Sequence, residues 1–174
     1  MKWHLNILLL IINLSIIGII ILGIIISFDL ASSITNPETS FSEKIKLDYF
    51  QDAKDTSSEI VAYVFIAIYL ALHLFLLTKF VSTNISIKAL LKRGLIYKNQ
   101  NKDLRNIGSG FILFAKLKYS LLMISGVFFY NDITVLIDAL PQFLLFYVLG
   151  KILLMISLIS AEGELIKQEN ELTV

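Results

Sequence analysis

A chain of 174 residues with 56% hydrophobic residues and a mean hydropathy of +0.77 is too apolar for an ordinary water-soluble domain. Its formal net charge of +1 does not favour any class of partner. The absence of cysteine excludes disulfides and thiolate chemistry, and two histidines are too few for a histidine-based metal centre. We therefore expect neither a metal site nor a cofactor.

Four long apolar runs predict an all-α membrane protein, a four-transmembrane-helix antiparallel bundle that forms one domain over residues 1–174. Each run is long enough to cross a hydrocarbon layer of about 30 Å at about 1.5 Å per residue. The runs are continuously apolar and do not alternate, which argues against a membrane β-barrel. The predicted spans are about 5–28, 60–80, 111–130 and 137–160.

The first run is longer than the apolar core of about 7–15 residues in a secretory signal, so we expect an uncleaved anchor. Asn13 and Ser15 within it are predicted to hydrogen-bond across helices, and Gly18 and Gly23 would permit a close approach to a neighbouring helix. The polar segment 29–58 follows as an outer loop, in which Glu43–Phe50 could form a short amphipathic segment. Two interpretations of this loop stay open, a recognition surface and a simple connector.

The connection between the second and third runs, residues 81–107, is basic. It contains one acid, Asp103, whereas the outer loop carries six acids and three lysines. Because lysine and arginine accumulate in cytoplasmic loops, we predict that this connection and both termini are cytoplasmic. The very short turn at residues 130–132 then makes the third and fourth spans an antiparallel hairpin. We expect the basic residues to contact lipid, and we expect no direct binding to nucleic acid.

Several polar residues interrupt the spans, and the predicted orientation brings them to one layer on the cytoplasmic side of the midplane. Lys116 and Lys118 cannot both face inward, because two residues turn a helix by about 200°. Since Lys116 shares a face with Tyr119, we predict that Lys116 faces the interior and that Lys118 reaches the lipid headgroups. The predicted layer consists of Lys151, His73, Lys116 and Asn13.

Two interpretations of this polar layer stay open. In the first, Lys151 is a tolerated charge that snorkels, loses its proton or is solvated by water. In the second, the layer lines a cavity for an anion, such as a lipid phosphate, a carboxylate-bearing solute or an acidic segment of a partner.

The C-terminal segment 161–174, "AEGELIKQENELTV", is predicted to continue the fourth helix into the cytoplasm and to end in apolar Leu172 and Val174. A strand-like end of this kind could add to a partner's sheet or have its carboxylate captured. Alternatively, the two apolar side chains fold back onto the protein itself.

Two stretches resemble a known family. The stretch "GLIYKNQNKDLRNIG" and the tail resemble small bacterial inner-membrane proteins with four spans that are grouped as domain of unknown function 2975. No activity is established for that family, and its members often occur beside a small helix-turn-helix regulator. The resemblance therefore implies a membrane component of a regulatory pair. The matching residues are Gly94, Tyr97, Asn101, Leu104, Arg105, Ile107 and Gly108, and in the tail Glu169, Asn170, Glu171, Leu172, Thr173 and Val174.

The leading hypothesis is a non-enzymatic protein of the bacterial inner membrane that binds a partner, such as a small helix-turn-helix regulator, at its cytoplasmic face. The sequence offers no intramembrane carboxylate pair and no Ser/His/Asp set at one depth, which argues against an enzyme. The alternatives are a small transporter or anionic-lipid-binding protein that uses the polar layer, and an immunity protein against a membrane-active peptide. A homo-oligomer is compatible with each. The partner surface would combine the tail 169–174 with Lys88, Lys92, Arg93, Tyr97, Asn101 and Arg105.

Overall fold

The computed structural model describes residues 2–35, 40–54, 57–93 and 100–172, and every regular element in these ranges is helical. Four helical stretches are long and apolar enough to cross a membrane, which confirms the all-α prediction with four spans. They are Trp3–Ser33, Glu59–Lys92, Gln100–Phe129 and Val135–Ile166. The elements in chain order are α1 (Lys2–Thr35), α2 (Phe41–Tyr49), α3 (Glu59–Arg93), α4 (Gln100–Ile124), the π-helix η1 (Ser125–Phe129), α5 (Val135–Asp138) and α6 (Leu140–Leu172).

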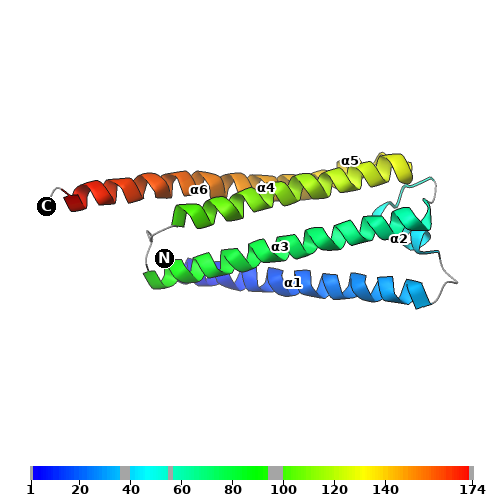
Figure 1. Cartoon of the computed structure of the whole chain (residues 1–174), viewed down its shortest axis with the longest axis horizontal. Coiled ribbons are helices and arrows are strands. Elements are labelled where there is room, and N and C mark those ends of the chain that lie inside the picture. Colours follow the sequence, from blue (N-terminus) through cyan, green and yellow to red (C-terminus); the bar gives the residue numbers. More distant parts are fainter. Residues whose placement is uncertain (1, 36–39, 55–56, 94–99, 173–174) are drawn as a thin grey trace.

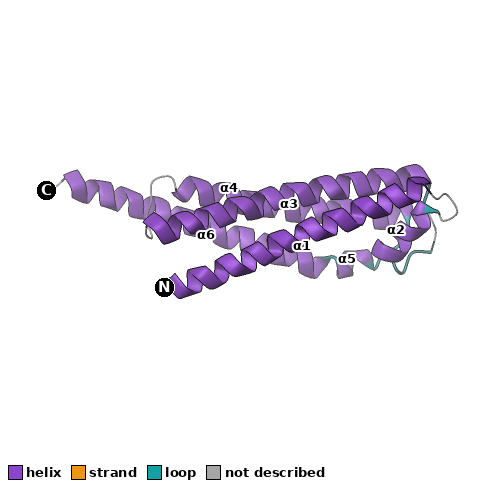
Figure 2. Ribbon diagram, turned by 90° about the horizontal axis from the view of Figure 1, so that it is seen from below, coloured by secondary structure: helices purple, strands orange, loops and turns teal. Residues whose placement is uncertain are grey.

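The four long helices run antiparallel in chain order, and each packs mainly against its neighbours in that order (Figure 1). The helices α1 and α3 form one hairpin, α4 and α6 form the other, and α3 packs against α4 between them. Helix α1 crosses the others obliquely (Figure 2). The beginning of α1 and the end of α6 lie at one end of the molecule, here called the terminal end, whereas α2 and α5 lie at the opposite cap end (Figure 1).

The helices extend well beyond the predicted spans. Helix α3 continues to Arg93, so residues 81–93 of the predicted inner connection are helical. Helix α1 continues to Thr35, and α6 carries Pro141 in its first turn, where proline is tolerated. The helices outlast the predicted spans because apolar runs measure the hydrocarbon thickness, while a helix continues through polar residues with good helix propensity, such as Lys88 and Lys92.

The closest helix contact joins α4 and α6 through two glycines. A Cβ atom added to Gly108 would lie 2.8 Å from the Gly150 carbonyl oxygen, and one added to Gly150 would lie 2.6 Å from the Gly108 carbonyl oxygen. The two backbones can touch only because neither residue has a side chain. Gly18 and Gly23 permit a close approach that no described helix makes, because a Cβ atom at either position would meet nothing within 4 Å.

Two clusters of buried apolar residues hold the bundle together. One lies between α3 and α4 and contains Leu72, Leu76, Ile107, Phe111 and Phe114. The other lies toward the cap end, where Phe50 and Tyr130 stack with their ring centroids 4.5 Å apart. Both of these aromatic side chains are fully buried.

The predicted outer loop contains a packed helix, α2, that is tied to α1, α3 and the α4–α6 turn. The Ser40 hydroxyl caps α2 by accepting a hydrogen bond from the Glu43 amide, and it donates to the Glu59 carboxylate at the start of α3. Lys44 pairs with Asp29 of α1 at 2.7 Å. Burial is the largest cause that raises the pKa of the Tyr49 hydroxyl above its ordinary value.

The short turn predicted at residues 130–132 is confirmed. The chain leaves η1 at Tyr130, and Asn131 adopts a left-handed backbone conformation with φ of 51°. The Asp132 carboxylate then accepts hydrogen bonds from the backbone N–H and the hydroxyl of Thr134. The Thr134 hydroxyl also lies 3.1 Å from the Asp52 carboxylate beyond α2 and shares its single proton between the two carboxylates, so the turn and the α2 segment form one packed cap.

Candidate functional site

The only buried ammonium group in the described part of the chain belongs to Lys118 of α4. Its residue is 7% exposed, and its Nζ donates a hydrogen bond of 3.0 Å to Gln142 Oε1 in the first turn of α6. The same Nζ lies 5.0 Å from the centroid of the Tyr69 ring and 5.9 Å from that of Phe114. A neutral amide and two aromatic faces therefore stabilise the cation, and no carboxylate among the described residues pairs with it.

His73 of α3 lies beside this group and is 5% exposed. Its Nδ1 is 2.8 Å from the Tyr69 carbonyl oxygen, and because a carbonyl only accepts, Nδ1 carries the proton. The imidazole packs against the rings of Tyr69 and Phe114, at centroid distances of 4.3 and 6.1 Å. His73 is thus held as a packed, hydrogen-bonded residue, which is one of its ordinary structural roles.

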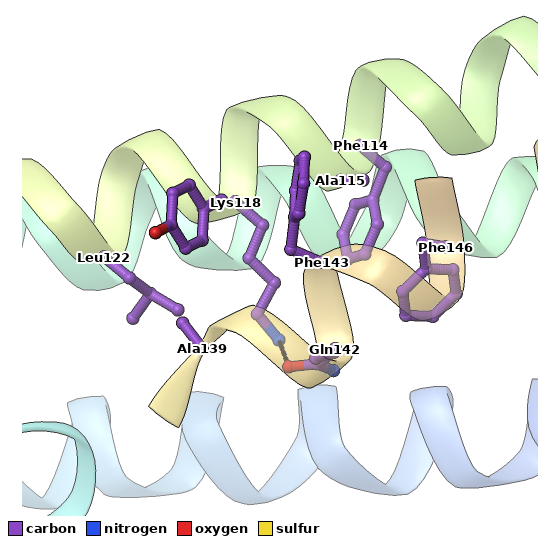
Figure 3. A pocket seen from close by; sticks show the side chains of 9 residues that line it. Phe114, Ala115, Lys118, Leu122, Ala139, Gln142, Phe143 and Phe146 are labelled. Atoms are coloured by element: carbon purple, nitrogen blue, oxygen red, sulfur yellow. Dashed lines mark hydrogen bonds between the residues drawn. The ribbon is translucent and has the colours of Figure 1, made fainter. Parts of the chain in front are cut away.

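A small cavity borders Lys118 between α4 and α6 (Figure 3). The Lys118 side chain runs along the cavity toward Gln142, and in this view the rings of Phe143 and Phe114 lie on the same side of it (Figure 3). Its volume of about 10 Å³ suffices for one water molecule at most. The cavity therefore offers no room for an organic solute or a lipid headgroup.

The prediction for the two lysines of α4 was wrong in its direction. Lys116 is exposed on the outside of the bundle, whereas Lys118 is buried. The buried face of α4 is set by its contacts with α3 and α6, and Lys118 continues the stripe formed by Leu104, Ile107, Phe111 and Ala115. That helical spacing in the sequence could have indicated that Lys118 is buried. No pattern in the sequence indicated that Gln142 would be its hydrogen-bond partner.

Lys151 does not join the predicted layer. Its side chain is exposed, and its Nζ lies 5.7 Å from the centroid of the Tyr147 ring on the same helix. The His73 ring contacts Phe114, which contacts Phe146 at a centroid distance of 5.0 Å. Lys151 is five residues farther along α6 than Phe146, or about 7.5 Å by the helical rise. Lys151 therefore faces outward, whereas His73 lies in the packed interior.

Asn13 forms a separate polar contact. Its Oδ1 accepts a hydrogen bond from the Nδ2 of buried Asn84, which joins α1 to α3. The prediction of hydrogen bonds across helices is confirmed for Asn13 and wrong for Ser15, whose hydroxyl donates to the Ile11 carbonyl oxygen of its own helix. The four residues of the predicted layer thus divide into an inter-helix amide pair, a packed histidine and two exposed lysines.

At the terminal end, α6 projects beyond the other helices (Figure 1). The Ser157 hydroxyl donates a hydrogen bond of 2.8 Å to the Asn101 carbonyl at the start of α4. Residues 162–172 lie beyond this contact and are called the α6 arm below; they span about 16 Å by the helical rise. Leu165 and Ile166 on the arm are 60% and 59% exposed, next to exposed Glu162 and Glu169.

The predicted basic residues lie at the same end. Lys88 and Lys92 are exposed on the last turns of α3, and Arg105 is exposed on the second turn of α4. Asn101 is half-buried near the start of α4. Arg93 ends α3, and Asn170, Glu171 and Leu172 belong to the end of α6. The predictions for Tyr97, Thr173 and Val174 lie outside the described residues.

Together these features define the chain as a helical protein whose four long apolar helices are typical of a multi-pass membrane protein. The described residues contain no group of three or more His, Asp or Glu side chains that could hold a metal ion. Comparisons with protein-family models, with curated proteins and with solved structures each found no match. What the protein does must therefore be inferred from its own residues.

Proposed function

We propose that this chain is a non-enzymatic, multi-pass protein of the bacterial inner membrane that binds a partner at its terminal end. Both termini would face the cytoplasm, and the protein would be the membrane component of a regulatory pair. The observation that carries the proposal is the α6 arm, which leaves the bundle and exposes apolar and acidic side chains together.

The arm supports binding because it exposes large apolar side chains, and exposing them to water is unfavourable unless a partner covers them. A span of about 20 residues from Leu140 would leave the hydrocarbon near Ser160, so the arm would lie in water or at the headgroup boundary. Leu165 and Ile166 would then expose large apolar side chains side by side. An amphipathic helix of this kind is suited to a groove on a partner protein.

The charge distribution also supports a partner-binding surface at the terminal end. Lys88 and Lys92 add exposed cations on α3, while the arm adds carboxylates. Charges of both signs on one surface steer a partner and fix its orientation more than they raise its affinity. The family resemblance points to a small helix-turn-helix regulator as that partner.

The proposal is tested by co-purifying the full chain with the product of the neighbouring gene. Deleting Leu172–Val174 should release the partner while membrane insertion stays normal, because the spans are intact. The Lys88→Glu/Lys92→Glu variant should weaken co-purification at least about tenfold, since each reversed charge acts against the partner's potential.

The matched control is Lys54→Glu, which reverses an exposed lysine of the outer loop. This variant should retain the partner fully. Co-purification that survives both the tail deletion and the reversal of Lys88 and Lys92 would contradict the proposal.

The transport alternative draws less support than binding. The cavity beside Lys118 holds about one water, and Lys116 and Lys151 face outward instead of lining a pathway. For the immunity alternative, the outer loop 29–58 would be the recognising surface, although Phe41, Ser42 and Ile45 of its helix α2 are buried against the protein.

A further inference from the structure

A groove at the terminal end lies between the first turns of α4 and the later part of α6. Its volume is about 430 Å³, far larger than that of the cavity beside Lys118. Lys102 and Arg105 line it from α4. Leu154, Leu158 and Ala161 line it from α6. The groove therefore combines a cationic wall and an apolar wall.

The two cations of the groove are free to meet an external anion. Neither the Lys102 ammonium nor the Arg105 guanidinium pairs with a carboxylate among the described residues, and both side chains are exposed. The acids that are close in sequence, Asp103 and Glu162, do not line the groove. The remaining polar lining comes from Asn101 and Ser157, whose mutual hydrogen bond joins the two walls.

The apolar wall distinguishes this groove from a simple phosphate-ion site. Leu154 and Leu158 belong to the last turns of the predicted fourth span, 137–160, directly before Ser160 and Glu162 mark the change to polar sequence. Lys102 and Arg105 face these leucines from the start of α4. A ligand that fits both walls carries an anionic group next to a hydrocarbon group.

We propose that this groove binds the phosphate headgroup of an anionic glycerophospholipid, with Lys102 and Arg105 on the phosphate and an acyl chain along Leu154 and Leu158. Basic pockets between transmembrane helices at the cytoplasmic boundary select such headgroups. The arginine can hold two phosphate oxygens at once, and the lysine adds a point charge. The site requires no partner protein, so lipid binding can be tested independently of the proposed function.

The test measures lipid binding to the full chain, purified in detergent without any partner. Native mass spectrometry follows titrations with phosphatidylglycerol, with phosphatidylcholine and with inorganic phosphate. The wild type should bind one phosphatidylglycerol about tenfold or more tightly than phosphatidylcholine. The Lys102→Gln/Arg105→Gln variant should lose about 30-fold in affinity for phosphatidylglycerol, because each cation near a headgroup contributes about a tenfold effect or somewhat less.

Two further variants separate the groove from general surface charge. Lys88→Gln/Lys92→Gln removes the same charge at the same end of the molecule but from outside the groove, and it should leave lipid affinity unchanged. Ala161→Trp keeps every charge and fills the groove, and it should weaken phosphatidylglycerol binding as strongly as loss of the cations does.

Three outcomes overturn the proposal. Equal loss in the Lys88/Lys92 variant would mean that net charge alone attracts the lipid. Unchanged binding in either groove variant would place the lipid elsewhere. Displacement of the lipid by inorganic phosphate at similar concentration would mean that the groove holds a free ion and that its apolar wall contributes nothing.

Discussion

Lys118 shows how a buried ammonium is kept without a carboxylate. On insertion scales a lysine at the centre of a membrane helix costs about 2.5–3.5 kcal/mol. A hydrogen bond from a charged donor returns about 1.5–3 kcal/mol, and cation–π contact with an aromatic face returns about 0.5–2 kcal/mol. These terms are of similar size, so the Lys118–Gln142 contact with the Tyr69 and Phe114 rings roughly offsets the cost of burial.

This balance predicts an asymmetry between two substitutions. Gln142→Leu should lower the free energy of unfolding by about 1.5–3 kcal/mol, because it leaves the Lys118 ammonium without its acceptor. Lys118→Met should change the free energy of unfolding by less than about 1 kcal/mol, because it removes both the cost of burying the ammonium and the contacts that stabilise it. The measurement is denaturant-induced unfolding in mixed micelles.

Lys116→Met is the matched control, since Lys116 is exposed two residues away on the same helix. It should leave stability unchanged, and the double variant with Lys118→Met and Gln142→Leu should recover most of the loss caused by Gln142→Leu. A larger loss from Lys118→Met than from Gln142→Leu would show that the cation is a net stabilising element and would refute this account.

At the scale of the elements, the α4–α6 hairpin depends on the contact between Gly108 and Gly150. Each glycine presents its backbone directly to the carbonyl oxygen of the other. Rigid backbone cannot move aside locally, so any added side chain must separate the two helices along their length. The glycine cluster at Ile107–Gly110 in the sequence therefore serves helix packing.

Gly108→Ala should lower the free energy of unfolding by about 1–3 kcal/mol, which is the usual cost of overpacking a tight contact. Gly110→Ala is the comparison, because the three atoms nearest to its Cβ would all belong to the flexible Lys79 side chain and not to backbone. Gly18→Ala, in open space on α1, should change nothing or be slightly stabilising. Thermal unfolding followed by circular dichroism ranks the three variants, and equal losses at Gly108 and Gly110 would contradict the assignment.

At the scale of the whole molecule, the two ends differ in character. The cap end is closed by α2 and the 130–134 turn, where Phe50 and Tyr130 stack and Lys44 pairs with Asp29. At the terminal end α6 extends beyond α4, and none of the described residues covers its arm or the groove. Recognition by this protein is therefore expected at the terminal end.

The proposed orientation predicts a labelling pattern in intact cells. The chain contains no cysteine, so each introduced thiol is the only one. Lys54→Cys in the outer loop should react with a membrane-impermeant maleimide, whereas Lys92→Cys at the terminal end should react only after the cells are opened. Labelling of Lys92→Cys in intact cells would reverse the orientation and remove the cytoplasmic partner surface.

The sequence by itself determined the number of long helices, the 130–132 turn and the amphipathic α2 segment. These features depend on local quantities: the apolar length needed to cross hydrocarbon, the turn-forming residues, and the spacing of apolar side chains. It also indicated that Asn13 would pair across helices, since a buried amide in an apolar helix needs a partner.

Only the tertiary structure decided which side chains face inward. Sequence spacing fixes the angle between Lys116 and Lys118 but leaves open the rotation of α4 about its own axis. That rotation is set by contacts with α3 and α6, chiefly the Gly108–Gly150 approach and the Phe111 and Phe114 rings. Lys118 is buried and Lys151 is exposed for the same reason. Each helix adopts the rotation that packs its surface most closely against its neighbours, and that rotation decides whether a lysine on it faces inward or outward.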